Sequence, residues 1–228
     1  MSNRKAEVLN KYLYNLSQLG YTRDDEKVKA IIKEIETEMG LLTNDPSDTV
    51  VKDSSKALVI AIKDCSGSMG FWENNVGKEY YELALRSLKE KYVDIKEIFI
   101  NHSTIANESE KEKFFVKYES GGTIMSSGLN ALVNHLHTDR EVIVIQISDG
   151  DNLSSDNGRC VKLLTDEILP KVKYFKYIET NQYNRHSTIL SVSGYKKIEN
   201  FDNFSKLIIK AKDDALKGLR LAEEINSI

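Results

Sequence analysis

The chain has few cysteines and few prolines, and it has no long apolar run. Cys65 and Cys160 are the only cysteines among 228 residues, and the prolines also number two. So few cysteines exclude a disulfide framework and are typical of reduced thiols in a cytoplasmic protein. So few prolines exclude long proline-rich linkers. No apolar run approaches the roughly 20 residues that a membrane-spanning helix requires, so we expect no membrane association.

The chain also lacks a large excess of positive or of negative charge. The 32 Lys and Arg residues face 35 Asp and Glu residues, which gives a formal net charge of -3. The sequence contains no stripe of basic residues that could neutralise the phosphates of a nucleic acid, so we expect no nucleic-acid partner. The first twenty residues have no apolar stretch followed by a small-residue cleavage site. We therefore expect no signal peptide and a cytoplasmic location.

Two regions differ in pattern, and the boundary between them lies near residue 55. Over 1–40 apolar residues recur at three- and four-residue steps in two runs, which predicts a short N-terminal helical hairpin. Turn-forming residues make 41–56 a linker. We therefore predict a helical appendage and linker over 1–55 and a second domain over 56–228. The hairpin either docks on its own body, which is usual for a lone amphipathic hairpin, or binds a partner.

Short apolar runs alternate with helical patterns from residue 57 onward. The runs ALVIAIKD (57–64) and EVIVIQISD (141–149) are nearly continuous and rich in β-branched residues. Such runs are typical of central strands in a parallel sheet that is buried on both faces. The alternation predicts an α/β fold with a doubly wound, mainly parallel sheet of the Rossmann type. Weaker strands are expected at 94–102, 114–119, 173–180 and 204–210, and helices at 75–92, 126–137, 157–171 and 213–225.

Polar side chains gather where the two strongest strands end. Asp64 ends the first strand, with Ser66 and Ser68 close behind it, and Asp149 ends the other strand. Ligands of open α/β sheets bind outside the carboxyl ends of the strands, so we expect both carboxylates to face one crevice. Two such carboxylates repel each other unless a cation or a proton lies between them. Thr123, in a Gly-Gly-Thr loop before a helix, adds a third hydroxyl group.

These oxygen atoms form a ligand set for a hard cation. Two carboxylates and three hydroxyl groups suit Mg²⁺, which takes six oxygen ligands and usually keeps some waters; Mn²⁺ is the alternative ion. Zinc is disfavoured because it prefers nitrogen and sulfur ligands. Cys65 interrupts the ligands, and we expect its side chain to point away from the metal. An open coordination position would then accept a carboxylate from a partner.

The same five residues carry a resemblance. The pattern Asp64-x-Ser66-x-Ser68, followed by Thr123 and by Asp149 at a strand end, resembles the metal-ion-dependent adhesion site (MIDAS) of von Willebrand factor A domains. The resemblance implies a von Willebrand factor A-like fold. It also implies that these five residues hold Mg²⁺, some of them through water.

A narrower resemblance covers most of residues 57–220. The chain is similar there to the bacterial YhbH/YeaH family of sporulation- and stress-associated proteins, through the strings SGSMG, FINHST, ESGGTIMSSGL, SDGDNLSSDNGRCVKL and NQYNRHSTIL. That family is associated with a PrkA-type serine protein kinase and with SpoVR-like proteins, which implies a class of partner. The chain departs from the family in its short amino-terminal region, in Asn101-His102 where a His pair is expected, and in Cys65 where an aliphatic residue is usual.

Four more residues are candidates for a supporting role. Asp151 and Asn152 either orient waters on the metal or form a polar turn after a strand. Arg185 and His186 follow another predicted strand. They either line the rim of the crevice and set partner choice, or belong to a solvated loop. His102 is expected to be structural.

The sequence supports three hypotheses of function. The first is a non-catalytic Mg²⁺-dependent adaptor or regulator in sporulation or stress signalling. Its partner, a PrkA-type kinase or an AAA+ ATPase, would supply an acidic residue to the metal. The second is a Mg²⁺-dependent phosphoester hydrolase in which Asp64, Asp149 and Asp151 hold the metal and His186 is the acid or base. No Walker loop or Asp-x-Asp-x-Thr loop supports it. The third is a chelatase-like subunit that docks to an ATPase ring.

Overall fold

The computed structural model describes residues 53–116, 121–183 and 185–209. The predicted hairpin within 1–40 and the predicted helix at 213–225 lie outside these residues. Within the described part of the chain, no helix combines the length and the apolar character needed to cross a bilayer.

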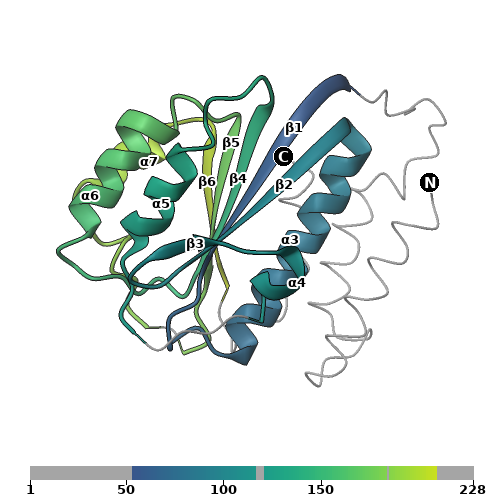
Figure 1. Cartoon of the computed structure of the whole chain (residues 1–228). Helices are drawn as coiled ribbons and strands as arrows, with labels where there is room; N and C mark the ends of the chain where they lie inside the picture. Colours follow the sequence, from purple (N-terminus) through teal and green to yellow (C-terminus); the bar gives the residue numbers. More distant parts are fainter. Residues whose placement is uncertain (1–52, 117–120, 184, 210–228) are drawn as a thin grey trace, which may run out of the picture.

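Six strands form one sheet with the order β3-β2-β1-β4-β5-β6 (Figure 1). All neighbours are parallel except β3, which pairs antiparallel with β2 at one edge. The chain runs outward from β1 to one edge and then returns through β4 to the other, so the strand order reverses between β1 and β4. The predicted doubly wound, mainly parallel α/β fold is confirmed. The strands are β1 (Asp53–Asp64), β2 (Tyr92–His102), β3 (Ala106–Glu108), β4 (Glu141–Ser148), β5 (Tyr174–Thr180) and β6 (Phe204–Ile209).

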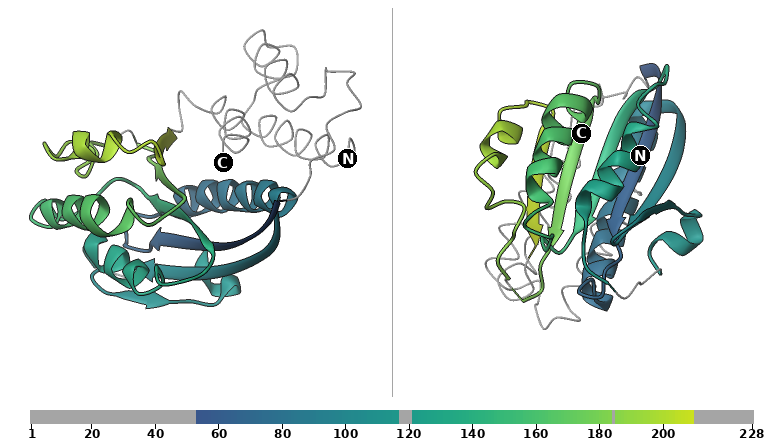
Figure 2. Two further views of the ribbon diagram at one scale, coloured as in Figure 1. Left: turned by 90° about the horizontal axis from the view of Figure 1, so that it is seen from above. Right: turned by 60° about the vertical axis from the view of Figure 1, so that its left-hand side comes forward.

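Helices cover both faces of the sheet (Figures 1 and 2). In Figure 1, α3 and α4 lie to the right of the sheet, and α5, α6 and α7 lie to its left. A π-helical segment, η1, continues α6. The bounds are α3 (Phe71–Lys91), α4 (Lys111–Phe114), α5 (Met125–Val133), α6 (Asn157–Lys162), η1 (Leu163–Ile168) and α7 (Tyr195–Glu199).

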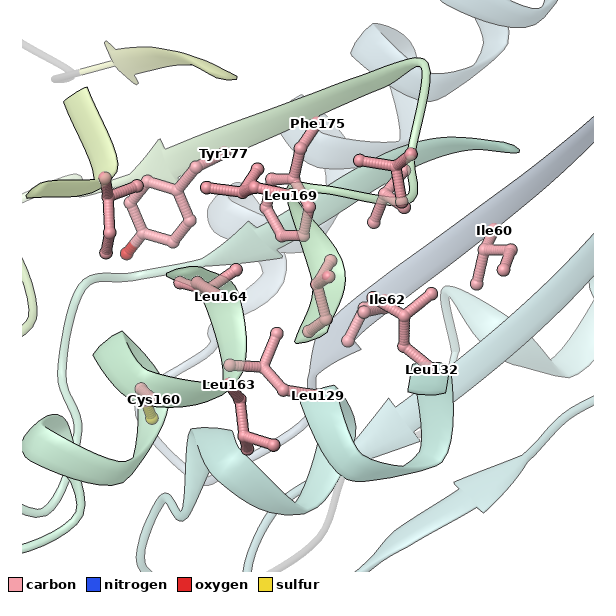
Figure 3. Close-up of a cluster of buried hydrophobic side chains, with 14 of the residues drawn as sticks. Ile60, Ile62, Leu129, Leu132, Cys160, Leu163, Leu164, Leu169, Phe175 and Tyr177 are labelled. Carbon is pink, nitrogen blue, oxygen red and sulfur yellow. The ribbon is translucent and has the colours of Figure 1, made fainter. Parts of the chain in front are cut away.

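Two apolar cores fill the space between the sheet and these two helical layers. Side chains alternate along β1, so Val59 and Ala61 pack in the core beneath α3, whereas Ile60 and Ile62 pack in the opposite core. Both faces of β1 and β4 are therefore buried, which explains why their sequences are almost continuously apolar. Figure 3 shows the second core, where β1 and β5 meet α5, α6 and η1 through Ile60, Ile62, Leu129, Leu132, Cys160, Leu163, Leu164, Leu169, Phe175 and Tyr177.

The strand predicted at 114–119 is wrong for the residues that the structure describes. Phe114 ends the short helix α4, and Phe115 follows in a turn. A helical turn lets both aromatic rings join the cluster formed by Tyr81 and Phe99. The Phe114 ring lies 5.1 Å from that of Phe99, and the Phe115 ring lies 5.8 Å from that of Tyr81, measured between centroids. Packing of two adjacent aromatics on one cluster thus outweighs their preference for strands.

Other differences from the predicted elements are small. β1 begins at Asp53, so the end of the expected linker, 41–56, belongs to the sheet. The strands expected at 94–102, 173–180 and 204–210 are present as β2, β5 and β6. The helices expected at 75–92, 126–137 and 157–171 are present as α3, α5 and α6 with η1. The short elements β3 and α7 were not predicted, because a period cannot be recognised over so few residues.

Gly77 sets how closely α3 approaches the sheet. A Cβ atom on Gly77 would lie 2.6 Å from Cγ2 of Ile147 in β4. Although Ala is the better helix former, we expect Gly77→Ala to lower the free energy of unfolding by about 1–3 kcal/mol through this overlap. The matched control is Gly158→Ala in α6, where an added Cβ meets nothing within 4 Å. We expect that change to be neutral, or stabilising by up to about 1 kcal/mol. Urea denaturation measures both, and a Gly77→Ala variant as stable as wild type would contradict the close packing.

Candidate metal centre

The candidate site lies at the carboxyl end of the sheet, where the strand order reverses. β1 ends at Asp64 and its parallel neighbour β4 ends at Ser148, directly before Asp149. Lys63 is paired with Ile147, so the ends of the two strands are level. The Ser148 hydroxyl group donates a hydrogen bond to Asp64 Oδ2 at 3.3 Å. The two strand ends that the sequence singled out therefore meet in one place.

A tight turn after Asp64 brings two hydroxyl groups back toward it. The Ser66 amide donates to Asp64 Oδ1 at 2.8 Å. The hydroxyl oxygens of Ser66 and Ser68 lie 3.1 Å apart. A similar turn follows β4, where the Asp151 amide donates to Asp149 Oδ1 at 3.1 Å. Backbone amides thus fix one oxygen of each carboxylate, and the serine hydroxyl groups stand next to the first of them.

Burial raises the pKa of both carboxyl groups. Asp64 is fully buried, and burial raises its pKa to about 6 even though hydrogen bonds from Ser66 and Ser148 act in the opposite direction. Burial also raises the pKa of Asp149; a hydrogen bond from Ser68 opposes this shift, and repulsion by Asp64 adds to it. Asp149 Oδ2 is buried and has no hydrogen-bond partner within the described residues. A cation between the two carboxylates would relieve their repulsion and engage that oxygen.

Thr123 lies on the loop before α5, between two other segments at the same end of the sheet. The Ile124 amide donates to the Ser103 carbonyl oxygen, after β2, at 2.8 Å. The Leu153 amide, after β4, donates to the Thr123 carbonyl oxygen at 3.0 Å. Thr123 is 7% exposed. The structure therefore places Thr123 beside the loop that carries Asp149.

Asn152 connects the Asp149 loop to two helices instead of reaching into the site. Its Oδ1 accepts from the Met125 amide at 2.9 Å, and its Nδ2 donates to Asn157 Oδ1 at 2.7 Å. Asp156 acts in the same way, because its Oδ2 accepts from the Ser126 amide at 2.9 Å. The start of α5, and with it the Thr123 loop, is thereby held against α6. Sequence reasoning missed Asp156, because its partner Ser126 lies on another helix and its side chain does not cap the helix that it precedes.

A buried pair on the other face of the sheet holds the end of the serine turn. Lys63 Nζ donates to Asn74 Oδ1 at 2.7 Å. The side-chain Nδ2 of Asn74 donates to the carbonyl oxygens of Met69 and Gly70, at 2.9 and 2.8 Å. β1 and α3 therefore anchor the turn that carries Ser66 and Ser68. Sequence reasoning missed both residues, although a lysine within an apolar strand was a signal of a buried partner.

The two thiols and His102 are buried structural groups. Cys65 Sγ donates to the His102 carbonyl oxygen at 3.2 Å. Burial raises the pKa of the Cys160 thiol, and the nearby Asp156 carboxylate raises it further, so Cys160 is not an activated thiolate. Burial lowers the pKa of His102 to about 4, which keeps its ring neutral. That ring packs against α5, where a Cβ on Gly128 would lie 2.8 Å from His102 Cδ2.

The segment after β5 is fastened to the Asp149 loop. The Thr188 amide donates to the Gly150 carbonyl oxygen at 2.9 Å, and the Asn152 amide donates to Thr188 Oγ1 at 2.8 Å. Asp151, which lies between these contacts, is exposed. The two loops therefore form one unit at the carboxyl end of the sheet.

The same segment presents Arg185 and His186 to solvent. Asn181 closes a turn, because its Nδ2 donates to the Arg185 carbonyl oxygen and its Oδ1 accepts from the Arg185 amide, both at 2.8 Å. Arg185 and His186 are exposed, just ahead of Thr188. Their positions fit the rim of the candidate site, and neither side chain reaches its buried floor.

The donor set fits a hard divalent cation. Among the described residues, no three His, Cys, Asp or Glu side chains gather in a metal-binding group. The candidate site has two such side chains, Asp64 and Asp149, and its remaining donors are hydroxyl groups. An all-oxygen set with two carboxylates suits Mg²⁺ or Mn²⁺ and does not suit Zn²⁺.

Comparisons with known proteins identify one family. A family model described as "Protein of unknown function (DUF444)" matches residues 43–222. UPF0229 proteins of Bacillus cereus (strain B4264) and of Bacillus thuringiensis (strain Al Hakam) are each 44% identical over 176 residues, which is 75% of this chain and 44% of the relative. The chain thus spans less than half the length of the curated relatives that it matches.

Two solved structures align with the chain at low identity. One is a von Willebrand factor type A protein from Catenulispora acidiphila, with a TM-score of 0.49 and 15% identity over 76% of this chain and 42% of that one. The other is the manganese-loaded TRAP protein of Plasmodium vivax, with a TM-score of 0.47 and 15% identity over 77% of this chain and 75% of that one. The observed sheet of mostly parallel strands with helices on both faces agrees with the doubly wound α/β fold that the sequence predicted.

The buried charge of Asp64 is expected to destabilise the protein when no metal is present. Its pKa of about 6 in the folded protein lies above the ordinary value of 3.8. The folded state therefore binds more protons than the unfolded state between these values, and the free energy of unfolding falls as the pH rises through that window. Asp64→Asn keeps an acceptor for Ser66 and can donate to Ser148. In chelator at pH 7.5, we expect it to be about 1–3 kcal/mol more stable than wild type.

Urea denaturation between pH 4 and pH 8 in chelator measures this effect. Asp139→Asn, an exposed residue at the other end of the sheet, is the control and should follow the wild-type curve. The expectation is contradicted if Asp64→Asn and wild type lose stability in parallel over the whole range.

Proposed function

We propose a function on the premise that the chain belongs to the DUF444 (UPF0229) family, whose function is unknown. This membership bears out the resemblance to bacterial YhbH/YeaH proteins. The proposed function is a Mg²⁺-dependent protein-binding module. Five residues hold the ion, with Mn²⁺ as the alternative, and a partner protein supplies an acidic side chain to it. The five are Asp64, Ser66, Ser68, Thr123 and Asp149.

One observation carries the proposal: two buried carboxylates lie at the ends of neighbouring strands, and neither forms an ion pair within the described residues. Asp64 receives hydrogen bonds from Ser66 and Ser148, and Asp149 has a buried oxygen without a hydrogen bond in the same part of the chain. Burial raises the pKa of both groups, so each carboxylate has a deficit of compensating charge when no cation is bound. A bound dication corrects this deficit, whereas a purely structural role would be served better by uncharged residues.

The composition of the ligand set supports binding of a further anion. Two carboxylates balance the charge of a dication, and the hydroxyl groups of the two serines and Thr123 add no negative charge. The ion would therefore keep an affinity for one more anionic oxygen. Binding a carboxylate oxygen from a partner is the chemistry that Mg²⁺ would supply at this site. The chain's own residues orient the donors: amides hold the carboxylates, and the Lys63–Asn74 pair holds the serine turn.

The cellular role is proposed from the family resemblance. In it, the module acts as an adaptor or regulator without catalytic activity, in sporulation or stress signalling, and its partner is a PrkA-type kinase or an AAA+ ATPase. Exposed Arg185 and His186 contribute to the choice of partner. The chain covers less than half of its relatives' length. The proposed role and partners therefore apply to the whole proteins of the family and not to this chain alone.

Metal binding is tested by calorimetric titration of the full chain with Mg²⁺ and with Mn²⁺, each with and without acetate as a stand-in for the partner's carboxylate. We expect saturable binding of one ion, with an affinity that falls by at least about 10–100-fold in Asp64→Ala. The matched control Asp139→Ala should bind like wild type. The emission of Trp72, in the first turn of α3, provides a second signal. Equal affinities in wild type and Asp64→Ala would contradict the site.

Phosphoester turnover separates this function from the hydrolase hypothesis. We expect no hydrolysis of p-nitrophenyl phosphate above background with saturating Mg²⁺, because nothing observed in the site positions His186, which is exposed, as an acid or base. Turnover that requires Mg²⁺ and disappears in Asp64→Ala would overturn the proposal in favour of an enzyme.

A further inference from the structure

Exposed apolar side chains are concentrated around the candidate metal centre. Six large apolar residues are exposed among the residues that the structure describes. Four of them lie at the carboxyl end of the sheet: three are on the loops that follow β2, β4 and β5, and the fourth begins α3 directly after the loop that follows β1. We call these four residues the apolar rim: Phe71 (78% exposed), Ile105 (68%), Leu153 (55%) and Tyr183 (68%).

Two members of the apolar rim flank Thr123. The Ser103 amide donates to the Ile105 carbonyl oxygen at 3.2 Å, and the Ser103 carbonyl oxygen accepts from the Ile124 amide at 2.8 Å. On the other side, the Leu153 amide donates to the Thr123 carbonyl oxygen at 3.0 Å. These backbone contacts bring the segments that carry Ile105 and Leu153 next to one metal-ligand candidate.

The other two members adjoin the carboxylate loops. Phe71 begins α3, immediately after the turn that carries Ser66 and Ser68. Tyr183 belongs to the segment that Thr188 fastens to the Asp149 loop. The guanidinium carbon of Arg185 lies 5.3 Å from the centroid of the Tyr183 ring, so a positive charge accompanies this aromatic side chain.

The arrangement is that of a protein-binding surface. Single exposed apolar residues are normal, but several around one polar centre indicate an interaction site. Aromatic and arginine side chains are enriched among the residues that contribute most to the binding free energy of protein–protein interfaces. Of the other two exposed apolar residues, Val93 lies at the amino end of β2, away from the candidate metal centre, and Val116 follows α4.

We propose that the apolar rim docks a segment of a partner protein in which an acidic residue is flanked by apolar side chains. This inference rests on the proposed function, because the acidic residue completes the coordination of the ion. The flanking apolar side chains contact the members of the apolar rim. Charge complementarity favours this occupant, since Arg185 attracts an acidic segment and a dication held at the site would add to that attraction.

Selection from a random peptide display library identifies a probe. The full chain is immobilised and the selection is run with Mg²⁺ and, in parallel, with chelator. We expect the peptides enriched only with Mg²⁺ to share an Asp or Glu next to aliphatic or aromatic residues. Enrichment of peptides without a carboxylate, or the same peptides in chelator, would overturn the proposal.

Variants of the apolar rim then separate docking from metal binding. With a synthetic peptide from the selection, fluorescence anisotropy should show binding weakened about 5–30-fold in Phe71→Ser and in Leu153→Ser. The exposed apolar control, Val93→Ser, should bind the peptide like wild type. All three variants should keep the wild-type Mg²⁺ affinity in calorimetry, because none changes a candidate ligand.

The outcomes distinguish failure of the inference from failure of the proposed function. Wild-type peptide affinity in both rim variants, with Mg²⁺ binding intact, overturns the apolar rim alone. Unchanged Mg²⁺ binding in Asp64→Ala overturns the proposed function itself. A dimer in sedimentation that Phe71→Ser dissociates would instead make a second copy of this chain the occupant, and would overturn the assignment to a partner segment.

Discussion

The hydrogen bond from Ser148 to Asp64 joins the ends of two parallel strands, and the candidate site depends on the pairing that makes it possible. The parallel register from Ala57 with Glu141 to Lys63 with Ile147 ends both strands at the same level. Because side chains alternate between the faces of a strand, a slip by one residue would turn Asp64 to the opposite face. The extensive burial of β1 and β4 fixes this register, so the two apolar cores also determine where the carboxylates meet.

Metal binding and stability place opposite demands on Asp64 and Asp149. Burial of Asp64 and Asp149 next to each other is unfavourable in the metal-free protein, as their raised pKa values show. The loops that carry them are nevertheless held by buried polar contacts, including the one between Lys63 and Asn74 and those made by Asp156. Such supporting contacts keep ligands in place before an ion arrives, which reduces the cost of ordering them on binding.

Simple periodic patterns in the sequence were enough to predict the centre of the sheet. The runs at 57–64 and 141–149 are apolar because both faces are buried, so their place in a parallel sheet was foreseeable. The position of Asp64 and Asp149 at the ends of these runs could be predicted for the same reason. Features that depend on contacts between distant segments were not foreseeable. The helical turn at Phe114, for example, arises from aromatic packing.

The supporting contacts and the apolar rim also depend on distant segments. The partners of Lys63 and Asp156 were not evident because each is distant in sequence or lies on another element. The exposure of Phe71 and Ile105 was equally hidden, since composition does not distinguish an exposed apolar residue from a buried one. Such features appear only when the loops are assembled at one end of the sheet.

Diffraction from crystals grown with Mn²⁺ tests the central claim most directly, because anomalous scattering at the manganese edge locates the ion without assumptions about its ligands. The proposed site predicts one strong anomalous peak among the side-chain oxygens of Asp64, Ser66 and Ser68, close to Asp149. A strong peak elsewhere on the chain, or no peak at this position at saturating Mn²⁺, would contradict it.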